Sequence, residues 1–520
     1  MSDRPGRPRS RAAGAPWPWW RSAVVYEIYV RSFCDGDGDG IGDLAGIRRQ
    51  IPYLAWLGVG AIWLTPINRS PMADGGYDVC DHLDIDPVFG DLAAFDALLA
   101  ECHAHGLRVL LDWVPNHTSD RHPWFLDARA SRGARRRSWY IWRDGDRPPN
   151  NWRAAFGGPA WTFDDTTQQW YLHLFLPEQP DLNWAEPQVR AAMHDVLRFW
   201  LDRGVDGFRA DVVHLIGKDA ALPDQPPELG EVERVRIHDH PGTHELLREI
   251  RRVVDAYDGE RMIVGEVNLR DTIRIAAYGA PDQLHLAFNF LALDAGFARG
   301  PWQALIDVVG HAFGPDAWPT WVLSNHDNPR VRTRFGGSEA RARAAAVLLL
   351  TLRGTPFVFQ GDELGLEDAV VADDQRFDPG GRDPCRAPMP WLRRPMHGWQ
   401  SAPALPFAPD AAARSVEAQI AQPRSTLWLY RRLIDLRRRH AALERGALEL
   451  VDAPHEVLAY DRVDGSERLR VLLNFGHEPA AVPREDWVLV LSSRAEAGAE
   501  WDGELPAETA LVLQRGEIRA

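Results

Sequence analysis

The sequence predicts an α/β fold: a closed (β/α)8 barrel of the TIM type, with a domain inserted after the third strand and a C-terminal antiparallel β-domain. Three observations support this prediction. Short apolar runs recur eight times, amphipathic segments separate them, and two stretches interrupt the pattern. A length of 520 residues is enough for roughly three domains, as a soft expectation.

Each of the eight runs is apolar and rich in β-branched residues, which predicts a buried strand. Strands that alternate with helices are parallel, because each crossover returns the chain to the same end of the sheet. Eight such units favour a barrel. A doubly wound open sheet is the alternative, but no glycine-rich phosphate loop opens any of the helices. The runs are VVYEIYVRSF from Val24, AIWLTP from Ala61, RVLLDWVPNH from Arg108, DGFRAD from Asp206, RMIVGEV from Arg261, LHLAFNF from Leu284, WVLSNHD from Trp321 and TPFVFQGDE from Thr355.

The segments between the runs have helical spacing. After Asp91, a candidate N-cap, apolar side chains return at the period of an amphipathic helix. They are Phe95, Leu98, Leu99 and Cys102. A last helix, which begins after the candidate cap Ser425, should close the barrel.

The two interruptions define the predicted domains. Residues 118–182 are rich in Trp, Arg, Gly and Pro and have no clear helical period, which predicts an excursion between strand three and its helix. Residues 441–520 alternate apolar and polar side chains, which predicts a small antiparallel β-domain. Residues 18–117 and 183–440 then form the barrel, and residues 1–17 form a disordered N-terminal tail.

Composition excludes some classes of function. The formal net charge of −15 argues against nucleic acid or an anionic membrane as a partner. The longest apolar run, from Ala344 to Leu352, is too short to span a bilayer, and the first residues lack an apolar signal segment. The four cysteines have no metal-ligand spacing, which favours a reduced, cytoplasmic protein. They are Cys34, Cys80, Cys102 and Cys385.

Polar residues gather where the predicted strands end. The active site of such a barrel lies at the C-terminal ends of its strands, so several polar ends together predict a catalytic pocket. A single strand that ends in an aspartate would be unremarkable. The polar ends are Asn116 with His117, Arg209 with Asp211, Glu266, His326 with Asp327, and Asp362 with Glu363, and Asp78 in the loop after strand two adds another.

Asp211 and Glu266 fit cleavage of a glycosidic bond. That reaction needs one acid to protonate the leaving oxygen and a second to attack or stabilise the anomeric carbon; a retaining pair faces each other about 5 Å apart. Arg209 shares a strand face with Asp211 and should keep it ionised as a nucleophile. The apolar approach MIVG should raise the pKa of Glu266 and keep it a proton donor. The alternative is that Arg209 and Asp211 form only a structural salt bridge.

At these residues the sequence resembles the α-amylase superfamily of glycoside hydrolases, and more narrowly its α-glucosidase and oligo-1,6-glucosidase group. The motifs DWVPNH, GFRAD, GEV, SNHD, QPDLNW and GRDPCRAPMPW carry the resemblance, which covers the chain from about Trp20. It implies that residues 118–182 are the family's domain B. It also implies an exo-acting retaining α-glucosidase that releases α-glucose from short α-1,4- or α-1,6-linked glucosides by double displacement.

The resemblance implies a role for each matching residue. Asp211 matches the nucleophile, Glu266 the general acid/base, and Asp327 the carboxylate that holds the sugar's 2- and 3-hydroxyls. The substrate-binding residues that it implies are the stacking Tyr77, Asp78 on the terminal glucose, His117 and His326 in subsite −1, Arg209 and Val212 beside the nucleophile, and Arg382, which caps subsite −1 together with Asp78.

The loop DGDGDGIGD predicts a cation site. Asp35, Asp37, Asp39, Asp43 and the carbonyl of Ile41 present oxygen ligands at alternate positions, which suits Ca²⁺, with Mg²⁺ as the alternative. The loop is not an EF-hand, because its twelfth position is a glycine. The other interpretation is a solvated acidic turn. Similar loops after strand one bind such cations in the family that the sequence resembles, and this resemblance favours a structural metal.

Linkage and reaction outcome stay open at this level. Val212 is similar to the valine of family members that accept α-1,6 linkages, but the segment VVHLIGKDAALPDQPPE departs from common members and leaves the aglycone undetermined. A glucosyl-transferring enzyme of the trehalose synthase or sucrose isomerase type would share every catalytic residue. A non-catalytic barrel, like the heavy chains of amino-acid transporters, is disfavoured because all three carboxylates are present. The expected partners are maltose, isomaltose and short oligosaccharides, without nucleic acid or membrane; the oligomeric state is not predicted.

Overall fold

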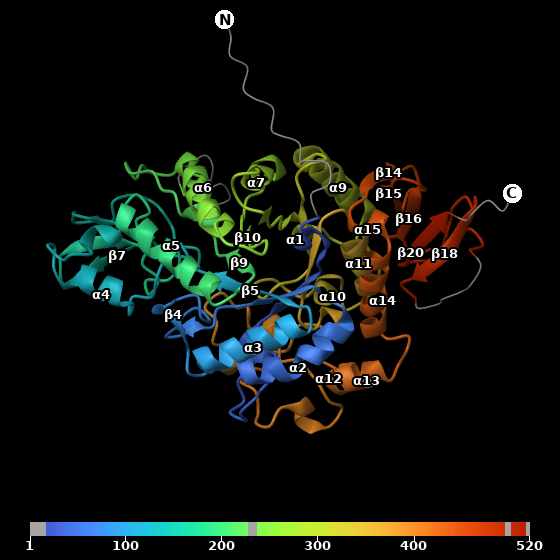
Figure 1. Cartoon of the computed structure of the whole chain (residues 1–520), viewed down its shortest axis with the longest axis horizontal. Helices are drawn as coiled ribbons and strands as arrows, with labels where there is room; N and C mark the ends of the chain where they lie inside the picture. The colour runs from blue at the N-terminus through green and yellow to red at the C-terminus, as the bar shows by residue number, and fades with distance from the viewer. Residues whose placement is uncertain (1–16, 227–236, 495–500, 516–520) are drawn as a thin grey trace, which may run out of the picture.

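A computed structural model of the chain describes residues 17–226, 237–494 and 501–515 and confirms the predicted barrel (Figure 1). Eight parallel strands form one sheet in the order β11-β10-β9-β5-β2-β1-β13-β12. Each strand lies within or beside one of the eight apolar runs. They are β1 Val25–Ile28, β2 Ala61–Leu64, β5 Arg108–Trp113, β9 Gly207–Ala210, β10 Met262–Gly265, β11 Leu286–Ala287, β12 Thr320–Val322 and β13 Thr355–Phe359.

The sheet closes through a side chain where backbone pairing is missing. Barrel strands that follow one another in the chain are neighbours, and β1 pairs with both β2 and β13. Between β11 and β12, the hydroxyl of Thr320 donates to the carbonyl of Ala287 (2.9 Å) and accepts from the amide of Asn289 (3.3 Å). The doubly wound open sheet is therefore excluded.

The strands are buried on both faces, as expected for a barrel wrapped by helices. In β1, Val25 packs inside the barrel with Trp63 and Phe357, whereas Tyr26 and Ile28 pack in the larger core outside it. This alternation makes Glu27 an inward-facing residue of the same strand.

Eight longer helices follow the barrel strands. The predicted caps are confirmed, because the side chain of Asp91 accepts from the amide of Ala94 and that of Ser425 from the amide of Trp428. The helices are α2 Leu44–Leu57, α3 Leu92–Ala104, α5 Pro187–Asp202, α6 Pro241–Asp255, α7 Thr272–Tyr278, α9 Arg299–Phe313, α11 Glu339–Thr351 and α14 Thr426–Arg439. Shorter connecting helices are α1 Trp19–Ser22, α8 Leu291–Asp294, α10 Val331–Arg334, α12 Ala411–Arg414, α13 Val416–Ile420 and α15 Ala441–Glu444.

The region after β5 contains more regular structure than its composition indicates. It holds a helix, α4 Pro123–Ala130, and a three-stranded antiparallel sheet of β6 Trp142–Arg143, β8 Gln169–Leu172 and β7 Trp161–Asp164. The helix has no apolar period in the sequence because only Phe125 and Ala128 of it are buried. This region, called domain B below, lies at one side of the barrel (Figure 1).

The C-terminal antiparallel β-domain is confirmed. Its sheet has the order β14-β15-β16-β20-β18, with β14 Ala447–Val451, β15 Val457–Asp464, β16 Glu467–Asn474, β20 Ala510–Arg515 and β18 Trp487–Ser492. Two small ladders complete the described strands: β3 Asn68–Arg69 with β4 Asp81–Ile85, and β17 Ala480–Ala481 with β19 Glu504–Leu505.

The predicted N-terminal tail, residues 1–17, falls outside the described residues except for Trp17. The Trp17 ring packs edge-on against Trp318 at 5.3 Å. Within the described part of the chain, no helix combines the length and apolarity needed to cross a membrane.

Candidate active site

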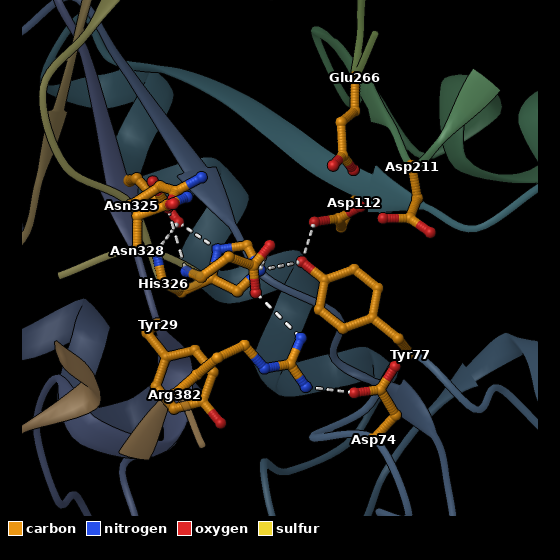
Figure 2. Close-up of polar contacts among 12 residues, drawn as sticks. Tyr29, Asp74, Tyr77, Asp112, Asp211, Glu266, Asn325, His326, Asn328 and Arg382 are labelled. Carbon is orange, nitrogen blue, oxygen red and sulfur yellow. Dashed lines mark hydrogen bonds and ion pairs between the residues drawn. The ribbon is translucent and has the colours of Figure 1, made fainter. Parts of the chain in front are cut away.

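Arg209 is the centre of the polar cluster at the strand ends. The side chain leaves β9 fully buried, and its guanidinium contacts three carboxyl groups. Nη1 donates to Asp112 (2.9 Å) and to Asp211 (2.6 Å), and Nη2 donates to Glu266 (2.5 Å). The two acids predicted to act on the glycosidic bond therefore share one cation, and their carboxyl groups point into the same space (Figure 2).

The electrostatics of this pair differ from the expectation. Burial raises the pKa of Asp211 well above its ordinary value of 3.8, Arg209 lowers it, and Glu266 and Asp112 raise it further. The prediction that Arg209 keeps the pKa of Asp211 low is wrong for this arrangement, because one guanidinium cannot offset burial and three carboxyl groups at once. Asp211, Glu266 and Asp112 therefore share the positive charge of one guanidinium.

Backbone strain next to Asp211 helps to orient Glu266. Val212 has φ 35° and ψ 41°, a left-handed conformation that is unfavourable for a β-branched residue. In this turn the amide of Val212 lies 3.3 Å from Oε2 of Glu266 and donates to it. Val212 is therefore placed beside both acids, as its position in the sequence indicates.

Tyr77 connects the acids to His326. Its hydroxyl lies 2.9 Å from Oδ2 of Asp112 and 2.7 Å from Nε2 of His326, and the two rings stack at 5.4 Å (Figure 2). Asp112 is a site residue that the strand-end argument missed. Asp112 is the first residue of the DWVPNH motif and lies within the strand, before the polar end at Asn116.

Asp327 lies in a cationic environment. Burial alone would raise its pKa, but the guanidinium groups of Arg382 and Arg386 hold the pKa below the ordinary value. Oδ1 of Asp327 accepts from Arg382 (3.0 Å) and Arg386 (3.2 Å), and Oδ2 lies 3.5 Å from Nε2 of His326. Asp327 is thus kept ionised.

The predicted pairing of Asp78 with Arg382 is wrong. The carboxylate of Asp78 is fully buried and accepts from the hydroxyl of Ser70 and from the amides of Ala73 and Asp74, so it shapes the loop. Asp74 is the residue that forms an ion pair with Arg382 (Figure 2). Asp74 precedes the GGYD motif by one position, and nothing in the strand pattern distinguishes it from Asp78.

Domain B contributes a wall of the site. Nε2 of Gln179 lies 2.9 Å from Oδ2 of Asp74 and 3.1 Å from Nε2 of His117, and the ring of Phe175 lies 5.0 Å from His117. The predicted residue His117 is therefore joined through Gln179 to the Asp74–Arg382 pair. Gln179 begins the QPDLNW motif.

Glu363, at one of the predicted polar strand ends, has a structural role. Oε1 of Glu363 accepts from the hydroxyls of Tyr26 and Tyr53, at 2.8 Å each, and Oε2 accepts from the amide of Gly361. Glu363 therefore ties β1 and α2 to the end of β13. Its neighbour Asp362 is also buried.

The acidic loop fits a cation in part. Ligand oxygens of Asp35, Asp37 and Asp39 lie within 4.8 Å of one another. Asp43 does not join them, because its carboxylate caps α2 on the amide of Gly46 (2.6 Å) and also accepts from two amides of the loop. The predicted ligand Asp43 is thus a helix cap in the structure, and three clustered carboxylates suit a hard cation.

Two models of known protein families match the chain. The model of the family described as "Alpha amylase, catalytic domain" matches residues 27–446, and one described as a domain of unknown function (DUF3459) matches residues 444–512. A probable alpha-glucosidase of Rhizobium meliloti is 41% identical over 499 residues, which cover 89% of this chain and 90% of the relative.

Two further relatives differ in the activity that their names give. An oligo-1,6-glucosidase of Parageobacillus thermoglucosidasius is 36% identical, and the match covers 91% of this chain and 93% of the relative. The solved structure of an alpha-glucosyl transfer enzyme, XgtA, superposes with a TM-score of 0.91 at 37% identity, covering 96% of this chain and all of that one.

Proposed function

This chain belongs to the α-amylase family of glycoside hydrolases, and from that premise we propose that it is an exo-acting retaining α-glucosidase. Its substrates are short α-1,4- or α-1,6-linked glucosides such as maltose and isomaltose, from which it releases α-glucose. The observation that carries the proposal is the contact of Asp211 and Glu266 with one buried guanidinium.

The reaction follows from these positions. Asp211 attacks the anomeric carbon as the bond to the glycosidic oxygen breaks, and Glu266 gives its proton to that oxygen. Water then attacks the glucosyl-enzyme while Glu266 takes a proton from the water, which frees α-glucose and restores Asp211. The ionised Asp327 accepts hydrogen bonds from sugar hydroxyls.

Exo-action is supported by the closed end of the site. Arg382 contacts Asp74 and Asp327, and Gln179 of domain B joins Asp74 to His117. The ion pairs of Arg382 lie away from the two acids (Figure 2), so a sugar chain would end there. The same residues offer hydrogen bonds to the terminal glucose.

We also propose that the protein binds a structural cation and is cytoplasmic. Asp35, Asp37 and Asp39 would hold a structural Ca²⁺ or Mg²⁺, which would stabilise the loop after β1. A cytoplasmic location is consistent with four cysteines that are all free thiols in the structure.

Kinetics of Asp211→Asn test the proposal. The wild type should hydrolyse p-nitrophenyl α-glucoside, maltose and isomaltose, and the variant should lose about 10⁴-fold or more in kcat. Asp195→Asn on α5, whose carboxylate is exposed, is the matched control and should keep wild-type rates. Undiminished turnover by Asp211→Asn would remove the nucleophile assignment.

A glucosyl-transferring enzyme is the second candidate, because XgtA has the same fold and is named for glucosyl transfer. Product analysis at high sugar concentration separates the two. Free glucose should dominate for a hydrolase, whereas new disaccharides in excess of glucose would favour the transferase.

A further inference from the structure

Glu27 is a buried acid of the barrel that the mechanism above does not use. It faces inward from β1, and its side chain is 1% exposed. Oε1 lies 2.5 Å from Nδ1 of His326 and 3.3 Å from the His326 amide, whereas Oε2 is buried without a hydrogen-bond partner in the described structure. A carboxylate with one bare buried oxygen is costly, which calls for an explanation.

The protons along this part of the site can be assigned from donor and acceptor types. Arg209 and Trp63 can only donate, and they contact Oδ1 (2.9 Å) and Oδ2 (3.2 Å) of Asp112. Asp112 is therefore an acceptor on both oxygens, and the Tyr77 hydroxyl donates its single proton to Oδ2. Burial raises the pKa of Asp112, whereas Arg209 and the Tyr77 hydroxyl lower it and so favour the ionised acceptor.

The remaining links follow in order. The Tyr77 hydroxyl directs its only proton to Asp112, so its oxygen accepts from Nε2 of His326, 2.7 Å away. His326 is fully buried, and burial lowers its pKa to about 3, so the ring is neutral and carries one proton. With that proton on Nε2, Nδ1 is unprotonated and requires a hydrogen-bond donor.

Glu27 is the group that can supply this donor. We propose that Glu27 is a positioning residue: its carboxylic acid donates from Oε1 to Nδ1 of His326 and so keeps the proton of His326 on Nε2, the nitrogen that faces Tyr77 and Asp327. The unpartnered Oε2 is then a neutral carbonyl oxygen, which is cheaper to bury than half of a carboxylate. The role in catalysis rests on the proposed glucosidase function, whereas the proton placement does not.

The surroundings of Glu27 agree with a protonated acid. Burial raises the pKa of Glu27 well above 4.5; Arg209 and the His326 amide lower it, and Asp327 and Asp112 raise it. Arg209 is already shared by three other carboxyl groups. His326 is stacked between the rings of Tyr77 (5.4 Å) and Tyr29 (6.1 Å). These rings fix the plane of the imidazole, and Glu27 then determines which of its nitrogens carries the proton.

Nitrogen-15 NMR of the His326 imidazole in the free protein tests the proton placement. The signal is assigned by its loss in His326→Asn. The wild type should show the proton on Nε2 and an unprotonated Nδ1, and Glu27→Met should move the proton to Nδ1 or mix the two forms. A wild-type ring protonated on Nδ1 alone, or a ring unchanged in Glu27→Met, would overturn the proposal.

Kinetics test the consequence for the site. Glu27→Gln keeps a donor that cannot ionise, so it should retain activity at neutral pH and extend the alkaline limb of the kcat/KM profile. Glu27→Met removes the donor and should lower kcat/KM by about 10- to 100-fold. Equal kcat/KM values and pH profiles in the three proteins would contradict the role, whereas a wild type without α-glucoside hydrolysis would contradict the proposed function instead.

Glu363→Gln is the matched control, because it also changes a buried barrel carboxyl group to an amide. Glu363 only accepts hydrogen bonds and lies outside the site, so this variant should lower Tm but leave the pH profile unchanged. A profile that shifts in Glu363→Gln as in Glu27→Gln would assign the effect to packing. If Glu27→Met fails to fold, Glu27→Gln and the NMR of the wild type still decide the question.

Discussion

At the scale of single residues, the largest difference from the sequence-based prediction is that Asp74, and not Asp78, pairs with Arg382. Its carboxylate joins Arg382 to Gln179, so it closes the end of the pocket where the terminal glucose would lie. We expect Asp74→Asn to lower kcat/KM for maltose by about 10- to 100-fold, because the ion pair with Arg382 is lost at this end of the pocket.

The control for Asp74 is Asp84→Asn. Asp84 also forms an ion pair with an arginine, Arg69, but both side chains are at least one-third exposed and lie on the surface. The control should keep kcat/KM and Tm within error of the wild type. Asp74→Asn with wild-type kcat/KM would show that the ion pair is not part of substrate binding.

The site residues that the sequence predicts are those that end a strand or stand in a motif. Arg209, Asp211 and Glu266 are predicted because each follows an apolar run, and the structure brings them into contact. Asp74 and Glu27 could not be identified in this way. Which of two nearby aspartates turns inward, and which atom of a buried acid is left bare, are set by tertiary contacts.

At the scale of elements, the loop before α2 combines two tasks that the sequence does not separate. Asp35, Asp37 and Asp39 form the candidate cation site, whereas Asp43 caps the helix. We expect chelation to lower Tm and added Ca²⁺ to restore it, because the ion binds only the folded chain. Differential scanning calorimetry measures the shift.

Two variants separate the ligands from the cap. Asp37→Asn should remove most of the Tm increase given by Ca²⁺, since it takes a charge from the cluster. Asp43→Ala should cost about 1 kcal/mol or more with or without Ca²⁺, because a cap bond is lost in both states. A Ca²⁺ response that survives in Asp37→Asn and vanishes in Asp43→Ala would reverse these assignments.

Strand and helix positions were predictable where burial leaves a period in the sequence. The caps Asp91 and Ser425 and the apolar face of α3 are such cases. Domain B is the opposite case: α4 buries two side chains, and its three strands have two to four residues each, so no period is long enough to detect. Aromatic contacts hold this region instead, such as Phe125 stacked on Trp142 at 5.6 Å.

At the scale of the whole molecule, the C-terminal β-domain is joined to the barrel through buried arginines. Arg462 of β15 has no exposed surface and donates to the carbonyls of Thr351, at the end of α11, and Gly446. Arg437 of α14 donates to Leu350 and Leu352 at the same place. Cations at this position also suit the negative end of the helix dipole.

We expect Arg462→Met to destabilise the protein by about 2 kcal/mol or more, because two buried carbonyls lose their donor. Arg468→Met is the control: Arg468 is about one-third exposed and pairs with acids inside the β-domain. A lower Tm for Arg462→Met alone, within a single transition, is the expected result. Equal Tm values for both variants would show that this junction contributes little to stability.

The proposed mechanism depends on Asp211 and Glu266 acting on one anomeric carbon. Proton NMR of the first glucose released from maltose or isomaltose, recorded before mutarotation, tests this directly. Double displacement at Asp211 predicts α-glucose as the first product. β-Glucose among the first products would contradict it, because a single inversion requires a water between the acids and no covalent bond to Asp211.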